Sequence, residues 1–216
     1  MTRFPWISAA LVGAGLVVAL LPQLAESLQY ERAAVENGAY WRLLTGQLAH
    51  WTPRMAAIDL LVTLAAGAWL EMRSRRLLLG VLVSAGLLVA GTLYFWTASL
   101  TSYRGSSGIA SGLFVAMAIL VATGPAPAAM RGVAWICLAG FTAKAFWEAL
   151  GGAPLFAGQL PDGVAVAPAV HLAGALGAAI CVGVRPEKYL VRLGKWYARR
   201  DSNSRPSGSK PDALSS

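Results

Sequence analysis

Two histidines and one glycine-flanked serine are the residues of this chain best suited to chemistry. His50 and His171 are its two histidines, and Ser107 lies in the run Gly105-Ser106-Ser107-Gly108. An imidazole within about 3 Å of a serine hydroxyl can act as a general base and activate the serine as a nucleophile. Each feature also has a simpler explanation. A histidine in an apolar run can be a packed residue bonded to a neighbouring helix, and small residues spaced four apart favour close helix packing.

The composition indicates whether these residues belong to a soluble protein or to a membrane protein. Of the 216 residues 56% are hydrophobic and 13% are charged, whereas an average soluble domain has about 25% charged residues. This excludes a soluble enzyme, a disordered chain and a secreted disulfide scaffold, and it predicts an integral membrane protein. The net charge of +8 is concentrated in short loops and the C-terminal region, as expected for topology determinants. We therefore expect no nucleic acid partner, because no basic face interleaved with aromatic residues is present.

Six apolar segments are long enough to cross a bilayer, for which about 20 residues are needed. We predict an all-α membrane protein whose residues 1–184 form a six-transmembrane-helix bundle, and whose basic, Ser/Pro-rich residues 185–216 form a disordered cytoplasmic tail. The first segment is also similar to a secretory signal, but no clear cleavage site follows it. The six predicted spans are 5–22, 54–70, 77–97, 107–124, 129–149 and 164–184.

The distribution of basic residues predicts how the chain is oriented. With the N-terminus inside, thirteen of the eighteen Lys and Arg residues lie on the cytoplasmic side, so both termini are expected there. Residues 23–53 then form a long external loop. The spans 107–124 and 164–184 both begin outside, which places Ser107 and His171 in the same leaflet. Gly108 and Gly174 keep the two helices slim enough for hydroxyl and imidazole to meet.

With these residues in place, the chain resembles the rhomboid family of intramembrane serine proteases over residues 40–180. The features that match, in order, are Trp41-Arg42, His50, Gly105-x-Ser107-Gly108 and His171-x-x-Gly174. Within that family the chain is most similar to the rhombosortases. The supporting residues are Glu71, Tyr103-Arg104, Lys144 with Glu148, and Pro168 three residues before His171.

The resemblance implies that Ser107 is the nucleophile and His171 the general base, in a dyad that requires no acid. It implies an oxyanion site made of the Ser107 backbone N–H and polar side chains near the second span, with Gly105 and Gly108 as supporting residues. Many rhomboids have His-x4-His-x3-Asn here, and this chain has His50-x4-Met55-x3-Asp59. A thioether cannot donate a hydrogen bond, and one lost oxyanion donor costs about 2.7–4 kcal/mol.

Several roles remain open at this point. A protonated Asp59 can donate to the oxyanion. His50 either replaces the missing donor or only braces its loop. Lys144 and Glu148, one helical turn apart, are either a neutralising pair or residues that align the active site and recognise substrate, together with Tyr103 and Arg104.

The function implied by the resemblance is cleavage of membrane-anchored protein precursors, at an anchor made of a C-terminal Gly-Gly pair, an apolar helix and a basic tail. The location implied is a bacterial inner membrane, with membrane lipid and the substrate's anchor segment as partners and the active site facing outward. We expect no cofactor, and no metal because the two histidines are far apart in sequence. Two alternatives are a rhomboid-like protein that binds transmembrane helices without cleaving them, and a small transporter or scaffold with a polar path through Lys144, Glu148, Asp59 and His171.

Overall fold

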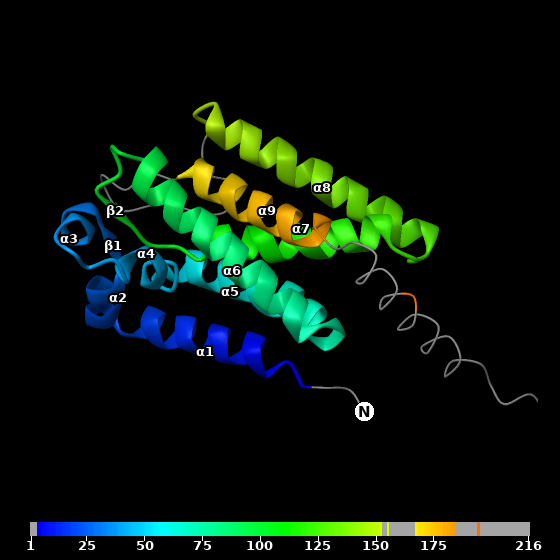
Figure 1. Cartoon of the computed structure of the whole chain (residues 1–216), viewed down its shortest axis with the longest axis horizontal. Helices are drawn as coiled ribbons and strands as arrows, with labels where there is room; N and C mark the ends of the chain where they lie inside the picture. The colour runs from blue at the N-terminus through cyan, green and yellow to red at the C-terminus, as the bar shows by residue number, and fades with distance from the viewer. Residues whose placement is uncertain (1–3, 153–154, 156–166, 185–193, 195–216) are drawn as a thin grey trace, which may run out of the picture.

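The computed structural model of the chain describes residues 4–152, Leu155, 167–184 and Gly194. Figure 1 shows long helices whose axes are roughly aligned, with α1 and α8 at opposite edges of the bundle. The elements are α1 (Trp6–Leu20), α2 (Pro22–Leu28), β1 (Tyr30–Glu31), α3 (Arg32–Glu36), α4 (Arg42–Thr45), α5 (Pro53–Arg73), α6 (Arg75–Gly91), the π-helix η1 (Thr92–Trp96), β2 (Ser102–Tyr103), α7 (Ser107–Thr123), α8 (Ala128–Ala149) and α9 (Pro168–Gly183).

The described part of the chain is an α-helical structure with helices that suit a membrane. By length and composition, α5 (21 residues) and the continuous segment from α6 through η1 (22 residues) can cross a bilayer, and their 18-residue windows have mean hydropathies of 1.5 and 2.2. The pair α1 and α2, bent by 111°, would make a third span. Helices α7 and α9 are apolar but shorter, with 17 and 16 residues. Each of the six predicted segments therefore contains a helix, while residues 164–166 and 185–193 and 195–216 lie outside the described residues.

Capping residues and prolines set the helix boundaries. The hydroxyl of Thr52 accepts a hydrogen bond from the Met55 N–H at 3.2 Å, and Pro53 follows as the first residue of α5. Ser74 caps α6 in the same way, accepting from the Leu77 N–H at 3.2 Å. Proline is favoured at the first helical position because its missing N–H would have no partner there, and Pro168 occupies that position in α9.

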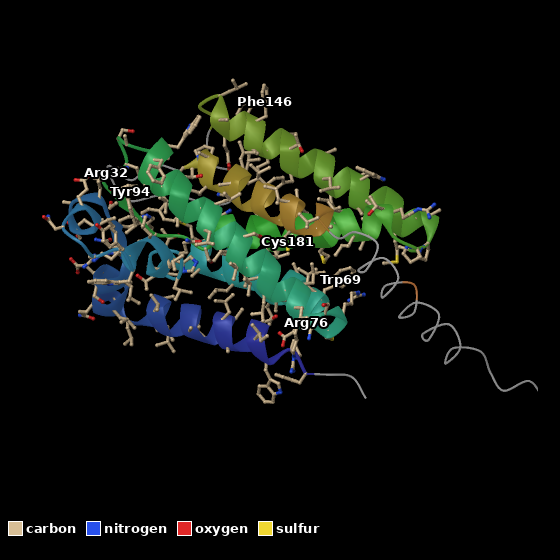
Figure 2. All side chains as sticks on the ribbon, in the orientation of Figure 1. Arg32, Trp69, Arg76, Tyr94, Phe146 and Cys181 are labelled. Atoms are coloured by element: carbon tan, nitrogen blue, oxygen red, sulfur yellow. The ribbon has the colours of Figure 1, made fainter. Side chains whose placement is uncertain are left out.

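The predicted external loop, residues 23–53, is folded. It contains α2, β1, α3 and α4, and β1 pairs with β2 in antiparallel register, Tyr30 opposite Tyr103. The Arg32 guanidinium donates to the carbonyls of Leu93, Tyr94 and Thr97 at 3.0–3.2 Å. These carbonyls end η1 and would otherwise have no helical donor. Figure 2 shows Arg32 beside Tyr94 at this end of the bundle, with Trp69 and Arg76 near the other end.

The core is built around α7, which packs against α5, α6, α8 and α9. The contact between α7 and α9 is made by backbone atoms. A Cβ atom on Gly108 would lie 2.9 Å from the Val170 carbonyl oxygen, one on Gly112 would lie 2.8 Å from the Gly174 carbonyl oxygen, and one on Gly174 would collide with the Gly108 carbonyl oxygen. Only glycine at these positions permits this approach, so the small residues of the two helices bring their backbones into direct contact.

Glu71 attaches α1 to the bundle. Its side chain is buried on α5 and accepts hydrogen bonds from the backbone N–H groups of Ile7 and Ser8, at 3.1 and 2.8 Å, and from the Ser8 hydroxyl at 2.9 Å. A carboxylate beside the N-terminus of a helix satisfies free N–H groups and complements the helix dipole. Glu71 thus caps a helix other than its own.

The glycine contact predicts a selective loss of stability. Gly174→Ala should lower the free energy of unfolding by about 1–3 kcal/mol, because the new methyl group meets backbone that has no room to move. The matched control is Gly183→Ala on the same helix, where a Cβ atom meets nothing within 4 Å. Thermal unfolding of the detergent-solubilised protein measures both variants. Equal stability of the two would contradict the close backbone contact.

Candidate active site

The glycine contact places a serine and a histidine side by side. Ser107 is the first residue of α7, and His171 lies in the first turn of α9. The Ser107 Oγ and His171 Nε2 atoms are 3.0 Å apart, which is hydrogen-bond distance. The proximity expected from the two glycine-containing helices is therefore present in the structure.

A third side chain completes the arrangement from α8. The Glu148 Oε2 atom lies 3.2 Å from His171 Nδ1 and 2.7 Å from the Lys144 Nζ atom, and Glu148 is buried. A carboxylate accepts a hydrogen bond, so this contact favours the tautomer whose proton is on Nδ1. The Nε2 atom is then the free base that accepts the Ser107 O–H. This is the order of groups in a serine–histidine–acid triad.

The sequence left two roles open for Glu148, charge neutralisation of Lys144 and alignment of the active site. The helical spacing predicted a pair with Lys144, and that ion pair is present. The resemblance implied a dyad without an acid, whereas the structure adds a carboxylate on the far nitrogen of His171. The ammonium of Lys144 also approaches His171 Nδ1, at 3.4 Å. The positive charge compensates the buried carboxylate, which would otherwise be costly to remove from water.

A second serine–histidine pair lies next to the first and is arranged differently. The His50 Nε2 atom is 2.9 Å from Ser106 Oγ and 3.5 Å from Asp59 Oδ2. Both contacts use the same nitrogen. The buried Nδ1 atom of His50 has no hydrogen-bond partner among the described residues. In a serine–histidine–acid triad the acid lies on the histidine nitrogen opposite the serine, so this pair lacks the geometry of a triad.

Access separates the two serines as well. Ser106 and His50 are each 6% exposed, and they line a cavity of about 10 Å³. A cavity of that size holds about one water molecule and has no room for a peptide. Ser107 is only partly buried. Ser107 is therefore the more accessible of the two serines.

The other predicted site residues lie near Ser107, near Ser106 or in the loop before α7. Tyr103 reaches Ser107, with its hydroxyl 3.5 Å from Ser107 Oγ. His50, one of the expected oxyanion residues, contacts Ser106, and Asp59, the other, contacts His50. Arg104 donates from Nε to the Gln29 side chain at 2.8 Å and lies over the Trp51 ring, 4.5 Å from its centroid, so it braces the loop before α7.

Sequence reasoning did not identify Ser106 or Gln29 as partners. Ser106 is the unspecified residue inside the Gly105-x-Ser107-Gly108 motif. It lies 56 residues from His50, and no sequence signal connects the two. Gln29 lies 75 residues from Arg104, and no spacing rule connects them.

Backbone donors also face the site. The first hydrogen bond of α7 runs from the Ala110 N–H to the Ser106 carbonyl at 2.8 Å. The N–H groups of Ser107, Gly108 and Ile109 precede it, and a helix offers them no internal acceptor. The positive end of the helix dipole lies at the same place. Negative charge that develops on an atom bound to Ser107 would be stabilised there.

The described residues hold no group of three or more His, Cys, Asp or Glu side chains arranged to bind a metal ion. In comparisons with known proteins, the chain matches no protein-family model, no curated protein and no solved structure. The chemistry of the site is therefore inferred from the positions of Ser107, His171 and Glu148.

The two adjacent serines predict a selective chemical reaction. A fluorophosphonate, which reacts with base-activated serines, should label the protein at Ser107. Ser107→Ala should abolish the labelling, because it removes the activated hydroxyl. Ser106→Ala should retain it, because that hydroxyl belongs to the closed His50 pair. In-gel fluorescence followed by mass spectrometry of the labelled peptide identifies the site, and a label on Ser106 would reverse the assignment.

Proposed function

We propose that this chain is an intramembrane serine protease of the rhomboid type, most similar to the rhombosortases. The observation that carries the proposal is the line of contacts from Ser107 Oγ to His171 Nε2 and from His171 Nδ1 to Glu148 Oε2, at 3.0 and 3.2 Å. Three different helices supply the three groups. Such an arrangement is suited to activating a serine and has no evident structural purpose at a partly exposed position.

The proposed reaction proceeds in two halves. As Ser107 Oγ forms a bond to the scissile carbonyl carbon, the carbonyl π electrons move to its oxygen and the serine proton moves to His171 Nε2. When the carbonyl re-forms, the C–N bond breaks and His171 returns the proton to the leaving amine. A water molecule then attacks the acyl-serine carbonyl carbon and gives a proton to His171 Nε2. When the carbonyl re-forms, the bond to Ser107 Oγ breaks, His171 returns the proton to Oγ, and the acid product leaves. Glu148 stabilises the imidazolium in both halves and stays ionised.

The membrane setting is part of the proposal. Each of the six segments predicted to span contains a helix, which supports a six-span arrangement. A bacterial inner membrane is what the resemblance implies, and the distribution of Lys and Arg predicts that both termini are in the cytoplasm. Ser107 and His171 then lie on the outward side. A transmembrane substrate must unwind to expose its scissile carbonyl, which favours glycine near the cut because glycine is a poor helix former. A precursor anchored by a Gly-Gly pair and an apolar helix fits this requirement.

Met55 favours a second candidate, a rhomboid-like protein that binds transmembrane helices without cleaving them. It lies in the first turn of α5, where the rhomboid pattern has a histidine able to donate a hydrogen bond. A non-cleaving protein would have no need of that donor. The two experiments below separate the candidates, since only the protease changes its partner covalently.

The carboxylate on His171 predicts how activity depends on α8. Glu148→Gln should lower turnover of a reporter bearing a Gly-Gly membrane anchor by about 100-fold or more, because the amide can orient His171 in the wrong tautomer and cannot stabilise the imidazolium. Glu36→Gln is the matched control, since its carboxylate is 55% exposed and pairs only weakly with Arg32 at 3.5 Å. Rates are measured in proteoliposomes. Equal rates for the two variants would show that Glu148 only neutralises Lys144.

The substrate class predicts a change in secreted proteins. Cells that express this chain should release proteins whose C-termini end at or near a Gly-Gly pair, with the apolar helix and basic tail removed. Cells that express Ser107→Ala should keep the anchors attached. Mass spectrometry of protein C-termini in the two strains measures the difference, and identical C-termini would contradict cleavage of this class of precursor.

A further inference from the structure

A phenol lies beside the proposed nucleophile. The Tyr103 hydroxyl is 3.5 Å from Ser107 Oγ, and the Tyr103 side chain is buried. A serine oxygen that gives its proton to an imidazole still has lone pairs that accept hydrogen bonds. The Tyr103 O–H can therefore donate to Ser107 Oγ while Ser107 donates to His171.

The position of Tyr103 is determined by elements distant in sequence. Strand β2 holds it opposite Tyr30 of β1, and both rings belong to a buried cluster with Leu93 and Val170. The chain after Tyr103 is also fixed, because the Gly105 N–H donates to the Gly46 carbonyl at 3.2 Å. The phenol is thus oriented before any substrate binds.

Gly105 keeps the space between the two hydroxyls open. A Cβ atom on Gly105 would lie 3.1 Å from the Tyr103 hydroxyl oxygen and 3.6 Å from Ser107 Oγ. Any side chain at this position would press on the phenol and stand beside the nucleophile. The absence of a side chain on Gly105, the first glycine of the Gly105-x-Ser107-Gly108 motif, therefore allows the Tyr103 hydroxyl to approach Ser107.

The phenol keeps its proton. Burial raises the pKa of Tyr103, and the nearby Asp59 carboxylate raises it further, while the hydrogen bond to Ser107 acts in the opposite direction. The net shift is upward, so the hydroxyl is a donor at neutral pH and does not compete with His171 as the base.

We infer that Tyr103 is a catalytic residue that stabilises the oxyanion. The inference rests on the proposed function. In the tetrahedral intermediate the oxyanion is bonded to the same carbon as Ser107 Oγ, so a donor already beside Oγ is within reach of it. The Tyr103 O–H turns from Oγ to the oxyanion without giving up its proton, while the serine proton resides on His171. It acts together with the Ser107 backbone N–H.

This role accounts for the departure at Met55. The rhomboid pattern supplies a donor from the helix equivalent to α5, and a thioether at that position supplies none. Tyr103 provides a donor from β2 instead. Removal of one oxyanion donor lowers kcat by about 100- to 1000-fold in a serine protease, so a missing donor needs a replacement of this kind.

The test uses the full chain in proteoliposomes, with the Gly-Gly anchor reporter as the probe. Tyr103→Phe keeps the buried ring and removes one oxygen, and it should lower kcat about 100-fold with KM within twofold. Tyr30→Phe is the matched control, because it removes the hydroxyl of the paired tyrosine, which bonds to the Leu93 carbonyl at 3.3 Å. Tyr30→Phe should leave kcat unchanged.

A second measurement separates donation from packing. Met55→His adds a donor from α5 and should raise kcat at least tenfold more in the Tyr103→Phe background than in the unmodified chain, because a donor is lacking only there. Unchanged kcat in Tyr103→Phe, a loss that appears in KM, or an equal effect of Met55→His in both backgrounds would overturn the oxyanion role. Each result requires that the unmodified chain cleaves the reporter, whereas failure of that chain to cleave it would overturn the proposed function itself.

Discussion

The backbone contact between Gly108 and Gly174 is the interaction on which the rest of the site depends. Lipid tails are as apolar as leucine, so two membrane helices gain little from burying apolar side chains against each other and associate mainly through close packing. Glycine allows α7 and α9 to approach until carbonyl oxygens of one lie against Cα atoms of the other. Because Ser107 is adjacent to Gly108, and His171 is three residues before Gly174, this contact also sets the distance between hydroxyl and imidazole.

The charged groups of the site, Lys144 and Glu148, both lie on α8, because a buried carboxylate needs a nearby positive charge. Glu148 is buried and pairs with Lys144 one turn earlier on α8, so α8 brings its carboxylate to the site already neutralised. Burying a single carboxylate would be costly. The pair leaves one carboxylate oxygen shared between Lys144 and His171. Two residues on one face of one helix thus orient His171 and compensate the buried charge.

How much of the fold and of the site could be predicted from the sequence depended on whether the interaction leaves a regular sequence pattern. Apolar run length predicted a helix in each of the six long apolar segments, although by length and composition two or three helices can span a bilayer. Small residues near Ser107 and His171 predicted that these side chains meet. For Lys144 and Glu148 the sequence left two roles open, a neutralising pair and alignment of the active site, and it did not predict the specific contact from Glu148 to His171, because a dyad requires no acid. The pairing of His50 with Ser106 and the folded segment 23–53 were missed for another reason. They depend on contacts between short, non-periodic segments, for which sequence offers no repeating pattern.

Arg32 binds three carbonyls of residues 93–97 with one guanidinium group. The end of η1 and the start of α3 cannot separate without breaking all three of these hydrogen bonds, and no single water molecule could replace the guanidinium on the three carbonyls. Since β1 precedes Arg32 and pairs with β2, the same guanidinium links η1 to the strand that leads into the site.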